Sequence, residues 1–334
     1  MTKARTRKLG QSAETVSAMG LGCMPMSGSY NVPEINEEES LRVLNLALDK
    51  GINFWDTANV YGKDGANEIL LSKVLKHRRD DIFIATKFGI SSLLGTTYTV
   101  DGRPEYVHKC MDESLKRLGV SSVDLYYQHR VDPNTPVEVT VQAMRDLVKA
   151  GKTRYLGLSE CSAATLRKAH AIHPISAVQV EYSPWSRDIE HNDLLKTARE
   201  LGVTVVAFSP LGRGFLTGQL KKASDLPDGD FRKGLPRFAD EHMEKNFSLV
   251  EALQGLATEK GITVPQLVLA WVLAQGEDII PIPGTKRSKY FLDNVQALDV
   301  NLTPGDLKAM EQILVENPVS GMRFSDALMA FVNI

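Results

Sequence analysis

The chain has 334 residues, of which 43% are hydrophobic and 24% are charged, and these fractions are ordinary for a globular protein. This length is too great for one small core and fits either two modest domains or one large α/β barrel with added loops. The formal net charge is −2 and no strongly basic face is indicated, so neither nucleic acid nor an anionic membrane is an expected partner.

The three cysteines, Cys23, Cys110 and Cys161, lie far apart and form no C-x-x-C pair. This pattern predicts neither a disulfide framework nor a zinc site, and it favours a reducing, cytoplasmic compartment. The basic N-terminal stretch MTKARTRKLG lacks the apolar core of a secretory signal. The longest apolar stretch, VPQLVLAWVLAQG, is too short to cross a bilayer, so we expect no membrane segment.

Apolar, β-rich runs alternate with helical patterns through almost the whole chain. The runs lack a clean alternation of polar and apolar residues, which is typical of parallel strands covered on both faces. Eight strands are predicted, at 17–24, 52–58, 81–89, 123–130, 153–160, 177–183, 204–210 and 278–284.

The segments between the strands have the pattern of amphipathic helices. The first begins at an N-cap, Asn36, with Glu39 three residues later, and it ends at Gly51. Its predicted apolar stripe consists of Leu41, Leu44 and Leu48. Similar helical patterns lie at 103–119, 135–151 and 191–202.

Eight strand-then-helix units in sequence predict one (β/α)8 barrel domain over residues 1–334. Residues 6–19 have the pattern of a β-hairpin, which we expect at the bottom of the barrel. A long segment separates the seventh and eighth strands, and its polar stretch 221–238 is typical of either a functional lid or a disordered loop. A last helix from Thr303 precedes a tail that we expect to fold back over an opening.

Polar residues stand at the ends of consecutive strands, and the carboxyl ends of barrel strands are where chemistry gathers. The second strand ends in Asp56 with Tyr61 in the following loop, the third ends in Lys87, and the fourth ends in His129. Each residue alone has a common structural explanation as a turn residue, a packing aromatic or a solvated charge. Four of them together predict a shared site at the barrel mouth.

These four side chains suit proton donation by a phenol. A free tyrosine has a pKa of about 10, and a nearby ammonium is expected to lower it by stabilising the phenolate. Asp56 would hold Lys87 charged and oriented, and His129 would bond the same substrate oxygen as Tyr61. Together they would polarise a carbonyl and protonate it while a nucleophile adds to its carbon. No Ser-His-Asp or metal-ligand pattern fits as well.

Seven motifs occur in order: NFWDTANVYG, ATKFG, DLYYQHR, GLSE, VQVEYSPW, AFSPLGRGFLTG and PIPGTKRSKYFLDN. On these motifs the chain resembles the aldo-keto reductases over roughly residues 9–300, and within them the long-loop microbial and plant members that begin GLGCM. The resemblance implies a (β/α)8 barrel that binds NADPH without a Rossmann domain. It also implies hydride transfer between the nicotinamide and a carbonyl or alcohol.

The same resemblance implies roles for individual residues. The catalytic tetrad would be Asp56, Tyr61, Lys87 and His129, with Tyr61 as the general acid. Ser159 and Gln179 would bind the carboxamide of the nicotinamide, and Phe208 would stack on its ring. The pyrophosphate path would be lined by Ser209, Leu211 and Gly212, with Arg213 and Gly214 in the loop that closes over it.

The adenosine end of the cofactor is implied by the last motif. Its 2′-phosphate would contact Gly284, Thr285 and Arg287, together with Lys286 or Lys289, and Asn294 would hold the adenine. TKRSK places three cations in five residues after the eighth strand, where barrels of this class often bind phosphate. Because arginine offers a planar fork for a phosphate, this cluster favours NADPH over NADH.

Three positions depart from the family pattern. Glu160 follows Ser159 where many members have asparagine, Pro25 stands where glycine is expected, and Tyr290 replaces a polar side chain near the phosphate or adenine. The resemblance therefore implies carboxamide binding for Ser159 and assigns no role to Glu160.

The substrate is less visible than the cofactor. Met26, Tyr30, Trp185 and the tail at 324–331 would form an apolar wall suited to aryl or aliphatic aldehydes. Arg130 would bind either an anionic substrate or Asp132 as a structural ion pair.

Two other functions stay open. One is a cofactor-binding regulatory subunit with slow turnover, similar to the potassium-channel β subunits. The other is a different barrel enzyme, such as a lyase or an isomerase. The residues leave the natural substrate, the physiological direction and the oligomeric state undecided.

Overall fold

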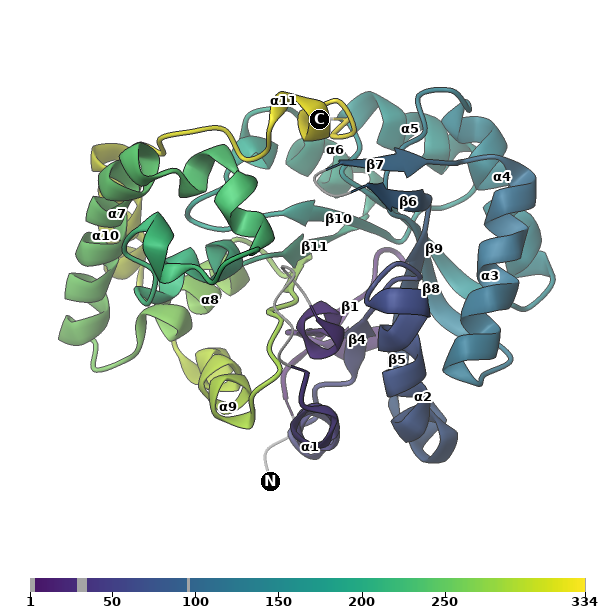
Figure 1. The fold of residues 1–334 in the computed structure, drawn as a ribbon, viewed down its shortest axis with the longest axis horizontal. Helices are drawn as coiled ribbons and strands as arrows, with labels where there is room; N and C mark the ends of the chain where they lie inside the picture. Colours follow the sequence, from purple (N-terminus) through teal and green to yellow (C-terminus); the bar gives the residue numbers. More distant parts are fainter. Residues whose placement is uncertain (1–3, 29–34, 95–96, 334) are drawn as a thin grey trace.

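The computed structural model describes residues 4–28, 35–94 and 97–333, and its eight parallel strands form one continuous sheet that curls into a barrel (Figure 1). Gly20 and Gly22 donate backbone hydrogen bonds to Pro281 and Pro283, at 2.9 and 3.3 Å, and so join the first strand to the last. The predicted (β/α)8 barrel is confirmed. Its strands are β3 (Leu21–Gly22), β4 (Phe54–Asp56), β5 (Phe83–Phe88), β8 (Val123–Gln128), β9 (Thr153–Ser159), β10 (Ala177–Glu181), β11 (Thr204–Phe208) and β12 (Ile279–Pro281).

The N-terminal hairpin closes one end of the barrel, as predicted. β1 (Thr6–Lys8) and β2 (Thr15–Ser17) pair antiparallel. Leu9 and Val16 are fully buried and pack in one cluster with Phe54 and Phe83, which begin their strands. The hairpin therefore covers the amino ends of the strands and leaves the carboxyl ends for the site.

Helices cover the outside of the sheet (Figure 1). In the first, Asn36 caps the helix by accepting a bond from the Glu39 N–H at 2.9 Å, as predicted. Its apolar stripe is shifted from the prediction: Ser40, Val43, Leu44 and Ala47 are buried, whereas Leu41 and Leu48 are only half-buried. The helices of the barrel wall are α1 (Glu37–Asp49), α2 (Ala66–Arg78), α3 (Pro104–Leu118), α4 (Val137–Lys149), α5 (Ala163–Ile172), α6 (Leu194–Leu201), α8 (Val264–Ala274) and α9 (Ser288–Gln296).

The long segment after β11 is built from short helical turns. They pack around an aromatic cluster in which Trp185 stacks on Phe215 at 4.4 Å between ring centroids and meets the edge of Phe238 at 5.5 Å. The turns are Gly212–Thr217, Ala223–Asp225, Phe231–Gly234 and Pro236–Phe238, and α7 (Asp240–Glu259) follows. Other single turns lie at Met24–Ser27, Lys63–Gly65, Arg79–Asp81, Asp188–Glu190 and Ala297–Asp299.

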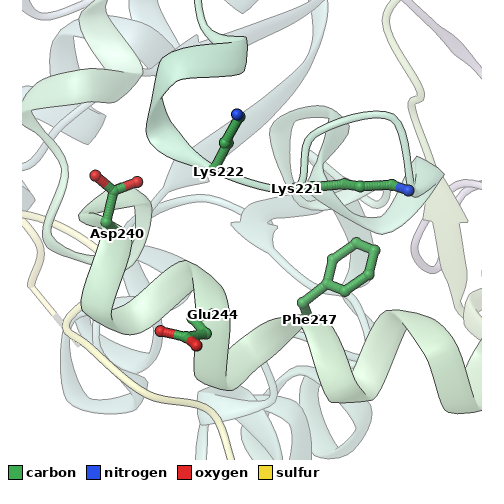
Figure 2. A pocket seen from close by; sticks show the side chains of 5 residues that line it. All are labelled: Lys221, Lys222, Asp240, Glu244 and Phe247. Carbon is green, nitrogen blue, oxygen red and sulfur yellow. The ribbon is translucent and has the colours of Figure 1, made fainter.

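A surface hollow of about 260 Å³ lies between this segment and α7 (Figure 2). Its wall is held by ordinary contacts, since Asp240 accepts a bond from the Ala223 N–H at 2.8 Å and the Lys221 ammonium lies 5.8 Å from the centre of the Phe247 ring. None of the predicted site residues lines it. The residues that do are Lys221, Lys222, Asp240, Glu244 and Phe247.

The C-terminal tail folds back over the carboxyl ends of the strands, as predicted. After α10 (Pro304–Glu316) it crosses the top of the view in Figure 1 to α11 (Asp326–Met329), near the hairpin of β6 (Ile90–Leu94) and β7 (Thr97–Val100). Phe331 packs on Tyr98 of this hairpin, with 4.7 Å between ring centroids. Within the described ranges, no helix is both long and apolar enough to span a membrane.

Candidate functional site

Three of the four predicted catalytic side chains come from neighbouring strands. Asp56 ends β4, Lys87 lies in β5 and His129 directly follows β8, and these strands pair in parallel, β4 with β5 and β5 with β8. Tyr61 arrives from the loop after β4, where its N–H donates to the Ala58 carbonyl at 3.1 Å. The structure therefore brings the four together at the carboxyl ends of the strands.

Lys87 is the centre of this group and is fully buried. Its ammonium donates to Asp56 Oδ1, to the Thr57 carbonyl at 2.8 Å and to the Tyr61 hydroxyl at 3.3 Å, so each of its three hydrogens has an acceptor. Gln179 of β10 donates to the other carboxylate oxygen, Asp56 Oδ2, at 2.7 Å. Neither Thr57 nor this Gln179 bond was predicted, because a backbone carbonyl and a side chain 123 residues away leave no sequence signal.

Burial and attraction act in opposite directions on the charged pair. Burial lowers the pKa of Lys87, but the adjacent Asp56 carboxylate and Tyr61 raise it more, so this pKa lies above its ordinary value. Burial raises the pKa of Asp56, and Lys87 and Gln179 oppose that shift. Lys87 therefore stays protonated and charged, because the groups around its ammonium are hydrogen-bond acceptors.

The phenol of Tyr61 is shifted in the direction opposite to the prediction. Burial raises its pKa, and although the Lys87 ammonium lowers it, the pKa stays above its ordinary value. The predicted lowering is wrong because the removal of the phenolate from water outweighs the single ammonium 3.3 Å away. Tyr61 therefore keeps its proton at neutral pH and is able to donate it.

His129 is a neutral imidazole in this setting. Burial, together with the nearby charges of Lys87 and Arg130, holds its pKa well below the ordinary value. Its ring meets the Tyr61 ring edge-on at 5.7 Å between centroids, and no described residue hydrogen-bonds to its buried Nδ1. A neutral ring beside the phenol is suited to bonding the oxygen that the phenol protonates.

The residues predicted to hold a nicotinamide stand on the next three strands. Ser159 ends β9 and lies in register with Gln179 of β10, and Phe208 ends β11. Ser159 and Gln179 are buried, whereas Phe208 is half-buried. Partners for a carboxamide and an aromatic face are thus available beside Asp56 along one rim of the barrel.

The turn after β11 has an unusual backbone. Ser209 and Arg213 have φ of 47° and 55°, which non-glycine residues seldom adopt and which occur often at functional sites. Gly212 and Gly214 also have positive φ, and the Leu211 carbonyl accepts the Gly214 N–H at 3.0 Å. Arg213 does not lie open in this turn, because its guanidinium donates to Glu181 at 2.6 Å.

The predicted phosphate residues gather before α9. The buried Thr285 hydroxyl accepts the Arg287 N–H at 3.1 Å, and Arg287 itself is exposed at the helix N-cap, with Lys286 half-buried between them. The Ser288 N–H donates to the Glu39 carboxylate at 2.8 Å, a contact that sequence reasoning had missed.

The remaining adenosine-end positions fit this layout. A Cβ on Gly284 would lie 2.9 Å from the ring of Pro25, so the unexpected proline packs against a glycine that must stay small. Asn294 is buried in α9, and Tyr290 is 40% exposed on its surface. A nucleotide therefore fits the residues present, because cations, a buried hydroxyl and close-packed backbone stand together at this corner.

Arg130 does not pair with Asp132, so the ion-pair alternative is wrong, and binding of an anionic substrate by Arg130 stays a prediction. Its guanidinium donates to the His129 carbonyl at 2.7 Å and to the Tyr98 hydroxyl at 3.1 Å. Asp132 instead accepts the Gly102 N–H at 2.8 Å and so orders the segment before α3. Arg130 is thus a bridge between the end of β8 and the β6–β7 hairpin.

The predicted apolar wall is only partly present. Met26 and Trp185 are buried in the core, Trp185 against Phe215, so neither lies on an open surface. Tyr30 lies outside the described residues. Phe324 and Phe331 do come from the tail over the strand ends, Phe324 being nearly buried.

Metal-binding groups do not gather here. In residues 4–28, 35–94 and 97–333, no three His, Cys, Asp or Glu side chains are arranged to hold an ion. The three cysteines are buried and not bonded to one another.

Comparison with known sequences identifies relatives along nearly the whole chain. A sequence model described as the Aldo/keto reductase family matches residues 18–315. The chain is 46% identical to a probable aldo-keto reductase 1 of Glycine max, over 99% of this chain and 95% of that protein. It is 48% identical to aldo-keto reductase str7 of Strobilurus tenacellus, over 95% and 94% of the two chains. It is 46% identical to aldo-keto reductase yakc [NADP(+)] of Schizosaccharomyces pombe, over 96% and 94%.

Solved structures give the same relationship. The glycerol dehydrogenase AKR11B4 of Gluconobacter oxydans aligns with a TM-score of 0.85 at 27% identity, covering 96% of this chain and 99% of that one. A thermostable aldo-keto reductase crystallised with the inhibitor epalrestat aligns with a TM-score of 0.74 at 29% identity, covering 92% and 99%.

Proposed function

Because the chain belongs to the aldo-keto reductase family, whose members are oxidoreductases that use a nicotinamide cofactor, we propose that it reduces aldehyde or ketone carbonyls to alcohols with NADPH. The observation that carries the proposal is the buried Lys87 ammonium, which touches both Asp56 and the hydroxyl of a protonated Tyr61. In this proposal the whole chain acts as one barrel domain in the cytoplasm on a small-molecule carbonyl.

Tyr61 would be the proton donor. When bound, the reduced nicotinamide supplies a hydride to the carbonyl carbon. The Tyr61 hydroxyl gives its proton to the carbonyl oxygen, and the Lys87 ammonium, 3.3 Å away, stabilises the phenolate that is left. Asp56 keeps Lys87 charged, and neutral His129 donates a second hydrogen bond to the same oxygen as negative charge develops on it.

The cofactor would lie along the rim from β9 to α9. Ser159 and Gln179 would hold the carboxamide, and Phe208 would pack against the ring. Arg287 and Thr285, with Lys286, would bind the adenosine 2′-phosphate, which agrees with the NADP(+) in the name of the Schizosaccharomyces pombe relative. The other proposed contacts are Ser209, Leu211, Gly212 and Arg213 for the pyrophosphate, Gly284 beside the 2′-phosphate and Asn294 for the adenine.

The test is NADPH oxidation with a panel of aromatic and aliphatic aldehydes, measured for the wild type and for Tyr61→Phe. We expect turnover in the wild type and a loss of at least about a hundredfold in the variant, with NADPH still bound, because only the donated proton is removed. Tyr155→Phe serves as a matched control, because Tyr155 stacks on Phe83 in the cluster at the hairpin end of the barrel, and it should keep the activity.

Two results would count against the proposal. If Tyr61→Phe lost NADPH binding as well, the tyrosine would be structural. If the wild type bound NADPH but turned over no carbonyl, the regulatory-subunit function would be favoured instead.

A further inference from the structure

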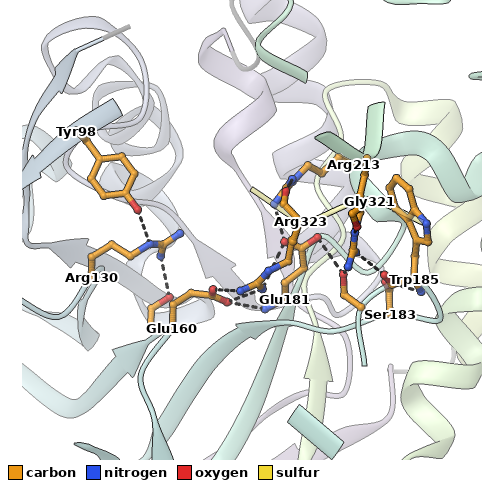
Figure 3. A network of polar contacts seen from close by, with 12 residues as sticks. Tyr98, Arg130, Glu160, Glu181, Ser183, Trp185, Arg213, Gly321 and Arg323 are labelled. Atoms are coloured by element: carbon orange, nitrogen blue, oxygen red, sulfur yellow. Dashed lines mark hydrogen bonds and ion pairs between the residues drawn. The ribbon is translucent and has the colours of Figure 1, made fainter. Parts of the chain in front are cut away.

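Four buried charged side chains link the C-terminal tail to the turn after β11 (Figure 3). Glu160 follows β9 and Glu181 ends β10, so the two carboxylates come from neighbouring strand ends. Arg323 belongs to the tail, and Arg213 belongs to the turn after β11. None of the four side chains is more than 8% exposed.

Glu181 is shared between the two arginines. Arg323 binds Glu160 with both terminal nitrogens, Nη1 to Oε1 at 3.1 Å and Nη2 to Oε2 at 2.6 Å, which is the strong two-bond geometry of this ion pair. Its Nη1 also lies 3.6 Å from Glu181 Oε2, and Arg213 Nη2 donates to that same oxygen at 2.6 Å. Arg213 further donates to the Arg323 carbonyl at 3.4 Å.

Attachment of the tail does not by itself require these charges. Buried ion pairs add little net stability, because the cost of removing the charges from water offsets their attraction. The tail is also fastened by neutral contacts. Ser320 exchanges hydrogen bonds with Asn246 at 2.7 and 2.9 Å, and Asn333 accepts the N–H of Ser162, the N-cap of α5, at 3.0 Å. The charges therefore call for another role.

Glu160 has a strained backbone and lies next to a residue of the proposed cofactor site. It has a φ of 51° and directly follows Ser159, the residue proposed to hold the carboxamide. Arg323 binds both of its oxygens, and Oε1 also accepts the Glu181 N–H at 3.0 Å, so the carboxylate is turned toward the tail.

We propose that Arg323 is a positioning residue for the nucleotide end of the site, an inference that rests on the proposed function. Arg323 holds the Glu160 carboxylate away from Ser159. It also takes up Glu181 when Arg213 leaves that carboxylate to meet a phosphate of the dinucleotide. The tail therefore acts on nucleotide binding through charge, in addition to covering the strand ends.

Removal of the Arg323 charge should weaken the binding of an anionic nucleotide. Without the Arg323 guanidinium, the cluster gains one negative charge relative to the wild type, next to the place where an anionic ligand is proposed to bind. The guanidinium groups of Arg130 and Arg237, which also act on Glu160 and Glu181, are the same in both proteins. Glu160 would lose both guanidinium hydrogen bonds and keep the one from the Glu181 N–H, and Glu181 would hold Arg213 without competition. Both changes disfavour a phosphate.

The test is a titration of the wild type and variants with NADPH, followed by protein fluorescence, so that no turnover is needed. Arg323→Met keeps most of the side-chain volume and should raise the Kd about tenfold or more. Adding Glu160→Gln to it removes the surplus carboxylate and should return the Kd to within about threefold of the wild type. Glu181→Gln should lower the Kd, since it frees Arg213.

Two controls separate charge from folding. Ser320→Ala removes the hydroxyl that meets His242 at 2.8 Å and leaves all four charges, so it should bind NADPH as the wild type does. Arg323→Lys keeps the charge and should keep most of the affinity, which provides a second variant if Arg323→Met unfolds.

The inference is overturned if Arg323→Met binds NADPH normally, or if the double variant binds no better than the single one. A wild type that fails to bind NADPH refutes the proposed function itself, and this inference with it.

Discussion

Replacing Asp56 by asparagine removes the carboxylate that keeps the buried Lys87 charged. The introduced amide would still offer an oxygen to one of its two partners, Gln179 or Lys87. If that oxygen faces Gln179, the amide NH2 group faces the Lys87 ammonium, donor against donor. The substitution therefore isolates a buried charge with little change in shape.

The loss is large because Lys87 is fully buried. Removing one partner of a buried ion pair costs about 3–5 kcal/mol, which is a sizeable part of a total stability of about 5–15 kcal/mol. Burial lowers the pKa of Lys87, and the attraction of Asp56 is the largest effect that opposes it. In Asp56→Asn the pKa of Lys87 should therefore fall, and a neutral amine would no longer stabilise the Tyr61 phenolate. We expect kcat to fall about 10²–10³-fold as this electrostatic contribution is lost.

Two measurements check this. Urea unfolding gives the change in stability, and the pH dependence of kcat between about pH 6 and pH 10 should show a new ionisation in the variant as Lys87 titrates within this range. Glu68→Gln is the matched control, because Glu68 is also buried and bonds Thr86, next to Lys87, at 2.6 Å and Arg117 at 2.6 Å. It should lose stability with an unaltered pH profile. An Asp56→Asn enzyme with wild-type stability and an unchanged pH profile would refute the pairing.

Three further predictions concern other parts of the molecule. Burial lowers the pKa of His129 only in the folded protein, so the unfolding free energy should fall as the pH drops below about 6.5. In His129→Gln, the slope of unfolding free energy against pH, measured by urea titrations, should be smaller by about 1.4 kcal/mol per pH unit. An unchanged slope would mean that the folded imidazole accepts the proton. Arg287→Ala should raise the Kd for NADPH at least about tenfold and leave that for NADH nearly unchanged; equal losses would show that Arg287 does not contact the 2′-phosphate. Leu9→Ala should lower the unfolding free energy by about 2–5 kcal/mol without altering KM, because it opens a void under the barrel far from the strand ends; a changed KM would contradict this separation.

The order of elements and the position of the site could be predicted from local patterns. All eight strands appear where apolar runs predicted them, and Asp56, Lys87 and His129 meet because neighbouring parallel strands end on one rim. The hairpin at the bottom was also predictable, since two short β-patterns flank a turn. These features depend on residues close in sequence or on a repeated unit, so they can be predicted from the sequence alone.

Only the tertiary structure decided the electrostatics. The ammonium beside Tyr61 was visible in the sequence, but the burial that outweighs it was not, so the direction of the Tyr61 pKa shift was predicted wrongly. Arg130 contacts Tyr98 instead of the nearby Asp132 for a similar reason: the choice depends on where the β6–β7 hairpin lies.

Glu160 shows the same limit most clearly. The sequence by itself marked this position as a departure from the family pattern and assigned it no partner. Its partner, Arg323, lies 163 residues away on the C-terminal tail, which folds back over the strand ends. Local patterns in the sequence determine the order of the strands and where they end. Burial and long-range charge pairing arise from packing, so only the folded chain determined which charged partner neutralises each charge at this site.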